Sequence, residues 1–497
     1  MVFSNLGDLI DRSREQDKPA IIDLGFAGSP RKYSYGEFDA LAHGTARALQ
    51  EKGFKRGTRV ALLAANSAEY FAVFCGIMRA GLISVPVNYK FPRETIHFII
   101  KDSGAQFVFY DAQRHSDCPT GLPKAEIGNG ALETFIDFST DPDDFQSITP
   151  KPDERAMFLY TSGSTGVPKG VVLSHQSHLW VVKTRLEAGD LSHHKFLIAA
   201  PMFHMNALAL AQLATAAHAT IVLLPAFDAR AYIDAIQAFR CTWLTAVPPM
   251  IAMILREETL AKADLSSVES IRMGSAPVSE SLMSATRQAF PNAAISNAYG
   301  TTEAGPVVFG KHPEGFDQPA LSVGYPHEGV ELRLTGPGAP DQGVLEIKCP
   351  ALMNGYHNRP DIPRPMSEDG FNITGDVFRR DENGFHFFVG RTDDMFVSGG
   401  ENIYPSDVER MLERHPDIVQ VCVVPIDDEI KGQKPVAFVV PRVGASLDAE
   451  AVKIFALAHA PAYQHPRFVW FLEKLPLATT NKIDRVELIR IARERSG

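Results

Sequence analysis

The chain has 497 residues, of which 45% are hydrophobic and 22% are charged. This length is ample for a large hydrophobic core and predicts two or more domains. The formal net charge of -10 argues against nucleic acid or an anionic membrane surface as the main partner, so any nucleotide contact is expected to be local.

The start of the chain and the cysteines predict a cytoplasmic protein. The opening sequence MVFSNLGDLIDRSREQD contains acidic groups and no long apolar run, so it resembles neither a signal peptide nor a membrane span. The cysteines lack the C-x-x-C spacing of zinc sites, and their odd number does not predict a disulfide framework. They are Cys75, Cys118, Cys241, Cys349 and Cys422.

Short apolar strands alternate with capped helices through the first part of the chain. Residues 60–63 predict a strand, which is followed by a helix over 68–80. The unit recurs as a strand over 220–224, a helix capped by Asp228 and a strand over 242–247. Repeated βαβ units predict an α/β fold whose parallel-rich sheets are covered by helices.

Residues 161–170 read TSGSTGVPKG and follow an apolar run. Its three glycines, four hydroxyl side chains and one lysine predict a flexible loop. The backbone N–H groups, the hydroxyls and the lysine of such a loop can donate hydrogen bonds to a polyphosphate. The helix-opening phosphate loop is excluded, because Pro168 precedes Lys169 and Gly170 stands where that motif needs Ser or Thr. Apolar residues follow, so we expect a β-strand and a hairpin-like flap over the phosphates.

Three further motifs combine residues suited to a nucleotide. In NAYGTTE, residues 297–303, Tyr299 offers a stacking surface, Thr302 a phosphate donor and Glu303 an oxygen ligand for magnesium. Asp376 in Thr-Gly-Asp can accept the two hydroxyls of a ribose, and Arg391 can donate to the same sugar. The motif GSAP at 274–277 is a third candidate loop.

The pattern changes near Arg391, after which shorter elements predict a small α+β domain. We expect a large domain over 1–390, a hinge at 391–393 that contains Asp393, and a small domain over 394–497. The adjacent glycines in Ser398-Gly399-Gly400-Glu401 let a thin ligand pass close to the backbone. The last motif, TNKIDR, contains Lys482 and Arg485.

In order and spacing, these motifs resemble those of the AMP-forming adenylating superfamily, which contains acyl-CoA synthetases, aryl-CoA ligases, peptide-synthetase adenylation domains and beetle luciferases. The chain looks most like an acyl- or aryl-CoA ligase. The resemblance implies ATP, Mg²⁺ and coenzyme A, and a mobile small domain. It makes Lys482, Thr302, His204 and Glu303 the catalytic residues, with Glu303 as the metal ligand. Asn481 stands where the family usually has glycine, and Asn tolerates positive φ.

The resemblance also assigns three groups of binding residues. The ATP site comprises Thr161, Ser162, Gly163, Ser164, Thr165, Gly166, Lys169, Gly274, Ser275, Ala276, Asn297, Ala298, Tyr299, Gly300, Thr301, Thr302, Asp376, Arg391 and Lys482. The acyl pocket comprises His204, Met205, Asn206, Ala207, Val247, Gly274 and Gly300. The coenzyme A channel comprises Ser398, Gly399, Gly400 and Glu401.

The acid itself is expected to be a hydrophobic monocarboxylate. The residues expected to surround the acyl group are apolar, and their stretches of sequence contain no arginine that could bind a second carboxylate. These residues are Val247, Pro248, Met273, Val307 and Val308. Aryl acids of the benzoate, coumarate or ferulate type and medium-chain aliphatic acids fit equally well. Asn206 can bond a ring hydroxyl or the backbone.

Other functions share the nucleotide motifs. They are the loading of a carrier protein, a luciferase-like oxygenation and, in a different class, non-catalytic acyl binding. Arg467, Lys431 or Lys434 could bind the coenzyme A nucleotide, because residues 462–466 read AYQHP and lack the basic residue of many relatives. A homodimer through the larger domain is compatible with the sequence.

Overall fold

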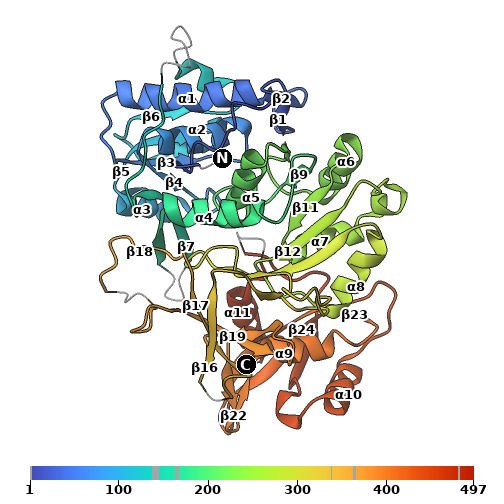
Figure 1. Cartoon of the computed structure of the whole chain (residues 1–497). Helices are drawn as coiled ribbons and strands as arrows, with labels where there is room; N and C mark the ends of the chain where they lie inside the picture. Colours follow the sequence, from blue (N-terminus) through green and yellow to red (C-terminus); the bar gives the residue numbers. More distant parts are fainter. Residues whose placement is uncertain are drawn as a thin grey trace.

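The computed structural model describes residues 3–136, 145–162, 167–336, 338–361, 365–478 and 482–496. Two seven-stranded sheets with their helices are followed by a four-stranded antiparallel sheet and a C-terminal α+β part, which is orange to red in Figure 1. The expected α/β fold with a smaller C-terminal α+β part is therefore confirmed. The boundaries at 390, 391–393 and 394 stay predictions, as does the mobility of the small domain.

The first sheet combines parallel and antiparallel strands. In spatial order it consists of β18 (Gly355–Tyr356), β8 (Pro168–Ser174), β7 (Arg155–Ser162), β4 (Ile83–Pro86), β3 (Arg59–Leu63), β5 (Ala105–Tyr110) and β6 (Lys124–Glu126). The strands from β7 to β6 are parallel, whereas β8 and β18 extend the sheet antiparallel. Strands β7 and β8 form the predicted hairpin around the phosphate loop, but Gly163, Ser164, Thr165 and Gly166 lie outside the described residues.

The second sheet is parallel except at one edge. In spatial order it consists of β13 (Ala294–Ala298), β12 (Ser270–Gly274), β11 (Trp243–Ala246), β9 (Lys195–Ile198), β10 (Thr220–Leu223), β1 (Pro19–Asp23) and β2 (Arg31–Ser34). Only β2 runs antiparallel to its neighbour. The carboxyl ends of β11, β12 and β13 therefore lie at one edge, where ligands bind in sheets of this kind.

Eight helices in the described part of the large region accompany these sheets. They are α1 (Tyr35–Glu51), α2 (Ala68–Arg79), α3 (Arg93–Ser103), α4 (His175–Leu186), α5 (Met205–Ala216), α6 (Ala229–Phe239), α7 (Pro248–Arg256) and α8 (Glu280–Ala289). The predicted cap Asp228 accepts from Ala231 N, and Ser67 caps α2 by accepting from Tyr70 N. Short 3-10 helices occur at Ala112–Asp117, Ala131–Thr134, Glu258–Lys262 and Ala462–Gln464.

Alternation along the strands divides the core into layers. Val60 and Leu62 pack in one cluster with α1, α2 and α5, whereas Ala61 and Leu63 pack against α3 on the other face. Strands β9 and β10 contribute to the first cluster too, and their alternate residues pack against α6, α7 and α8. Helices α1, α2 and α5 thus share one core with both sheets.

An antiparallel region that the sequence did not predict follows the second sheet. Its four-stranded sheet consists of β16 (Glu331–Thr335), β17 (Gln342–Lys348), β19 (Asn372–Arg380) and β20 (His386–Arg391), and β14 (Phe309–Gly310) pairs with β15 (Tyr325–Pro326). All neighbouring pairs are antiparallel. This region positions Asp376 on β19 and Arg391 at the end of β20.

The C-terminal part combines short strands and helices, as the predicted α+β character requires. Its sheet is formed by β21 (Phe396–Ser398), β22 (Glu401–Ile403), β23 (Ile418–Asp428), β24 (Gly432–Pro441) and β25 (Phe468–Phe471). Its helices are α9 (Pro405–Leu412), α10 (Ala449–His459) and α11 (Arg485–Ser496). Arg410 on α9 donates to the carbonyl oxygens of Phe388 and Val389, so α9 packs against the end of β20.

All five cysteines are free and buried, as expected. Among the described residues, no helix combines the length and the apolar character that crossing a membrane requires.

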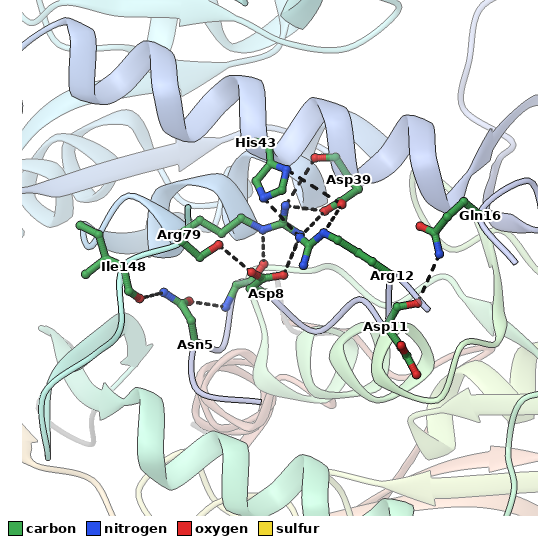
Figure 2. A network of polar contacts seen from close by, with 11 residues as sticks. Asn5, Asp8, Asp11, Arg12, Gln16, Asp39, His43, Arg79 and Ile148 are labelled. Atoms are coloured by element: carbon green, nitrogen blue, oxygen red, sulfur yellow. Dashed lines mark hydrogen bonds and ion pairs between the residues drawn. The ribbon is translucent and has the colours of Figure 1, made fainter. Parts of the chain in front are cut away.

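A buried ion-pair network fixes the N-terminal segment to α1 and α2 (Figure 2). Arg79 is fully buried and places Nη1 2.6 Å from Asp39 Oδ1, while Arg12 Nε lies 2.7 Å from Asp39 Oδ2. Asp8 accepts from Arg12, and Arg79 also donates to the carbonyl oxygen of Gly7. Burial alone would raise the pKa of Asp39, but Arg79, His43 and Arg12 outweigh it and hold the pKa below its usual value.

We expect Asp39→Asn to lower the free energy of unfolding by about 3 kcal/mol, because it leaves buried arginine charge without its partner. The loss should shrink in acid, since a carboxylate with a lowered pKa contributes stability that disappears as the pH falls through that pKa. Urea unfolding measures both effects. Glu487→Gln, which breaks the exposed pair with Arg490, is the matched control and should cost less than about 1 kcal/mol. Equal losses in the two variants would contradict the role of the network.

Candidate active site

A cavity of about 1010 Å³ opens where the second sheet, the antiparallel sheet and the C-terminal part meet. Gly274 and Ala298 end β12 and β13 on its wall, and Val247 follows β11. Glu409 and Glu413 of the α9 region, with Lys482, line it from the C-terminal part. Val247 and Lys482, which are 235 positions apart in the sequence, therefore share one cavity.

Asp376 is the polar centre of this cavity. It is 4% exposed, accepts a hydrogen bond from Tyr299 Oη at 2.5 Å through Oδ2, and pairs through Oδ1 with Arg391 Nη1 at 3.1 Å. Burial raises the pKa of Asp376, and the Arg391 charge, the Tyr299 hydroxyl and the Lys482 charge oppose that rise. The backbone N–H of Asp376 donates to Thr374 Oγ1, which fixes the turn before it. Carboxylate and guanidinium thus face one space, as a ribose clamp requires.

A second group of polar side chains connects the phosphate loop to the TTE turn. Lys169 on β8 donates to Tyr356 Oη at 3.0 Å, and Tyr356 donates to Glu303 Oε1 at 3.0 Å. The Lys169 ammonium also lies 4.2 Å from the centre of the Tyr356 ring. Thr161 Oγ1 is buried and has no hydrogen-bond partner among the described residues. A cation, hydroxyls and a carboxylate lie together here, which fits phosphates with a magnesium ion bound by Glu303.

Lys482 extends from the C-terminal part into the cavity. Its pKa is lowered, first by burial and then by the charge of Arg391, whereas Asp376 opposes the shift. The same lysine acts on His204, whose pKa falls to about 3 through burial, Lys482 and Lys90. His204 Nε2 is buried without a partner among the described residues, so the imidazole is neutral at physiological pH. Lys482 is therefore close enough to both the Asp376 clamp and His204 for its charge to act on them.

The predicted acyl residues on α5 are divided between the wall of the cavity and the core. Met205 and Asn206 on α5 line it, whereas Ala207 is buried in the core shared by the two sheets. A helix explains this, because Met205 and Ala209 lie one turn apart on the lining face and Ala207 faces away. Met273, Val307 and Val308 are likewise core residues and do not line the cavity.

Two glycines in the wall permit close backbone contacts. A Cβ on Gly274 would lie 2.9 Å from the carbonyl oxygen of Ala298. A Cβ on Gly300 would lie 2.6 Å from Pro306 Cα and 2.7 Å from the carbonyl oxygen of Gly305. Any side chain at these positions would displace backbone, so the glycines keep the wall of the cavity in place.

The predicted coenzyme A loop lies apart from the cavity in this arrangement. Gly399 and Gly400 form the two-residue turn between β21 and β22, and both have positive φ, at 62° and 91°. Ser398 is buried, Glu401 is exposed, and Gly399 N donates to Lys431 O. The channel that these residues are expected to form stays a prediction.

The predicted ATP-site residues that the structure describes gather around the cavity. Those that line it are Thr161, Lys169, Gly274, Ser275, Ala276, Asn297, Ala298, Tyr299, Gly300, Thr301, Thr302, Asp376, Arg391 and Lys482. Glu303, His204, Val247 and Asp393 line it as well. The side chain of Ser162 and the whole of Asn481 lie outside the described residues.

Sequence reasoning missed three polar residues of the wall. Tyr356 lies on a two-residue strand, and no local motif marked it. Arg272 stands two positions before Gly274 on β12, so strand alternation could have placed it on the same face. Arg185 stands one helical turn after Val181 on α4.

Comparisons with known proteins agree with this geometry. Residues 11–357 match the family model described as AMP-binding enzyme, and residues 407–482 match that of the AMP-binding enzyme C-terminal domain. A feruloyl-CoA synthase of an Amycolatopsis species is 31% identical over 467 residues, which cover 92% of this chain and 93% of the relative. The 4-coumarate–CoA ligase 3 of Arabidopsis thaliana is 29% identical over 505 residues, with 96% and 89% covered.

A solved structure resembles the whole chain. The ATP-bound crystal structure of MatB from Rhodopseudomonas palustris superposes with a TM-score of 0.90 at 26% identity, covering 99% of this chain and all of that one. An indoleacetate–CoA ligase of Aromatoleum aromaticum is 31% identical over 91% of the chain and 92% of the relative. The chain belongs to the AMP-binding enzyme family.

Proposed function

We propose that the protein is an ATP-dependent acid–CoA ligase that forms AMP and acts on an aromatic acid. The insertion of Lys482 into the cavity beside Asp376 and His204 is the observation that carries this proposal. The relatives are named for feruloyl, 4-coumarate and indoleacetate, and these names favour an aromatic acid over a medium-chain aliphatic one.

In the first half-reaction, an oxygen of the acid attacks the α-phosphorus of ATP, the bond to the β-phosphate breaks, and pyrophosphate leaves. Lys482 would neutralise charge between the carboxylate and the α-phosphate, with Thr302 as a second donor. Neutral His204 would orient the acid without adding charge. Magnesium, when bound by Glu303, would neutralise the phosphates.

In the second half-reaction, the thiol sulfur of coenzyme A attacks the acyl carbon, and AMP leaves with the electrons of the broken carbon–oxygen bond. Lys482 lines the cavity in the observed arrangement, while the Gly399 loop lies apart from it. Both elements belong to the C-terminal part, so a rotation near Asp393 would exchange them.

A panel of aromatic and aliphatic acids tests the proposal. With ATP, magnesium and coenzyme A, we expect AMP release that requires coenzyme A and is fastest with aromatic acids. Exchange of pyrophosphate into ATP without coenzyme A-dependent AMP release would instead favour the loading of a carrier protein. Absence of exchange with every acid would favour a non-catalytic binding protein.

Lys482→Ala separates the two half-reactions. Removing a cation that acts on the developing charge should slow adenylation by about 100-fold or more. Thioester formation from a supplied acyl-adenylate should stay within about twofold of wild type, as measured by coenzyme A consumption. Lys474→Ala, at an exposed lysine of the same region, is the control. Equal loss of both half-reactions in Lys482→Ala would refute this division of labour.

The contact between the two parts contains an ionisable group. Glu413 follows α9, lines the cavity and accepts from the backbone N–H of Val421. Burial first, and then the charge of Glu409, raises its pKa to about 8, while Val421, Ser279 and Arg410 act in the opposite direction. An open arrangement would expose Glu413 to water. At pH values between the usual pKa of its carboxyl and about 8, closing the two parts would therefore bind a proton at Glu413.

We expect Glu413→Gln to favour the closed arrangement as the pH rises. In the wild type, closure becomes less favourable as the pH rises from the usual pKa of a glutamate to about 8, because the closed arrangement must bind a proton at Glu413. The neutral amide of Gln removes this dependence on pH. The rate of pyrophosphate exchange in the variant, divided by that of the wild type, should therefore increase by roughly tenfold or more from pH 5.5 to 8. Above pH 8 this ratio should level off. Exposed Glu429→Gln should show a constant ratio. A flat ratio for Glu413→Gln would contradict the proton uptake.

A further inference from the structure

Two arginines line the cavity without a carboxylate partner. Arg185 ends the last turn of α4, and Arg272 lies in the middle of β12. Within the described ranges, Arg272 donates to the carbonyl oxygen of Pro306 at 3.0 Å, and neither arginine forms an ion pair. By contrast, the buried Arg79 pairs with Asp39, and the half-buried Arg485 pairs with Glu409.

The two side chains converge on one wall. Arg272 and Gly274 alternate onto the same face of β12, and Arg272 reaches Pro306. Val181 lies 3.6 Å from the position of a Cβ on Gly305, and Arg185 follows Val181 by one turn on the same face of α4. The pair therefore lies at the loop from Gly300 to Pro306, which contributes Gly300 to the expected acyl pocket. The same loop carries Glu303, the partner of Tyr356.

Electrostatics leave this pair with positive charge that nothing in the described wall neutralises. Burial lowers the pKa of both arginines, and the Arg272 charge lowers that of Arg185 further. Arginine nevertheless stays protonated in proteins, so the two guanidinium groups repel each other inside the cavity. A guanidinium group that is partly removed from water without a counter-charge is costly, and a bound anion would reduce that cost.

The neighbouring wall is apolar. Met205, Val247, Pro248 and Met250 line the cavity from α5 and the start of α7. An aromatic ring can pack on these groups, while a carboxylate on the ring accepts two parallel hydrogen bonds from one guanidinium. The chemistry of this end therefore fits a ring with an acid group remote from the reacting one.

We propose that Arg185 and Arg272 bind a second carboxylate of the substrate, so that the enzyme selects an aromatic dicarboxylic acid and adenylates the carboxylate nearer Lys482. This proposal rests on the proposed ligase function and narrows its substrate class. The sequence-based expectation of a monocarboxylate depended on finding no arginine near the acyl stretches. The fold brings Arg185 from α4 to the wall of the cavity. Arg272 lies on β12, outside the stretches on which that expectation was based.

Matched acids test the proposal. Benzoate is compared with terephthalate, and cinnamate with 4-carboxycinnamate, by AMP release with ATP, magnesium and coenzyme A. We expect the second carboxylate to raise kcat/KM by about 10- to 100-fold, as charge-assisted hydrogen bonds do. A preference for the monocarboxylate in both pairs would overturn the proposal while leaving the ligase function intact.

Variants assign the effect to the arginines. Arg185→Met and Arg272→Met should lose the preference for the dicarboxylates, mainly through KM for the acid, and leave KM for ATP within about twofold. Arg272→Lys keeps the charge and should restore part of the preference. Arg230→Met, at an exposed position on α6, is the control. A raised KM for ATP with an unchanged acid preference would mean that the pair binds phosphate, and it would overturn the proposal.

A binding measurement separates this proposal from the ligase function. Calorimetry with terephthalate and ATP-free enzyme should show binding that weakens about 10- to 100-fold in Arg185→Met and Arg272→Met. If no acid supports AMP release but terephthalate still binds through the arginines, the ligase proposal fails and the site remains. If terephthalate binds wild type and both variants equally, or binds none of them, the arginine site is refuted. Melting temperatures of the variants within a few degrees of wild type exclude misfolding as the cause.

Discussion

The buried carboxylate of Asp376 connects the parts of the molecule that form the cavity. It lies on β19 of the antiparallel sheet, accepts from Tyr299 after β13 of the second sheet, and pairs with Arg391 at the end of β20. Lys482 of the C-terminal part acts on the same charge. A single carboxylate held away from water by four segments makes the position of each segment depend on the others, because a buried charge must keep its partners.

The positions of the remaining groups follow from that centre. Strand ends place Gly274 and Ala298 beside it, and the β7–β8 hairpin brings Lys169 to the Tyr356–Glu303 pair. Cations therefore come from three directions: from the hairpin, from the C-terminal part and from the wall of Arg185 and Arg272. Acidic side chains also line the cavity: Asp376 and Glu303, and on the side of the C-terminal part Asp393, Asp394, Glu409 and Glu413. Positive and negative groups are thus nearly balanced over the whole cavity, and it is their local arrangement, not the net charge of the chain, that sets where an anion can bind.

The sequence predicted the fold where periodicity was strong. Strand 60–63 and the helix capped by Asp228 occur within one residue of their predicted ends, because apolar alternation and a side-chain cap are local signals. The sheet of β16, β17, β19 and β20 was missed, since its strands are partly exposed and no helix separates them. Most of the residues that the motifs assign to the nucleotide line the cavity. Tyr356 and Arg185 were not found, because tertiary contacts and not neighbours in the chain bring them to the cavity, while Arg272 carried only the signal of strand alternation.

The shared core of α1, α2 and α5 has a consequence for how the enzyme can evolve. Because these helices pack against both seven-stranded sheets, neither sheet can shift without opening the largest cluster of buried side chains. The walls of the expected acyl pocket are thus held by a frame whose packing does not depend on which acid is bound. Under the proposed function, side chains at the ends of β11 and β12 and on α4 can be replaced to alter the wall that faces the acid, without moving this frame or the groups around Asp376.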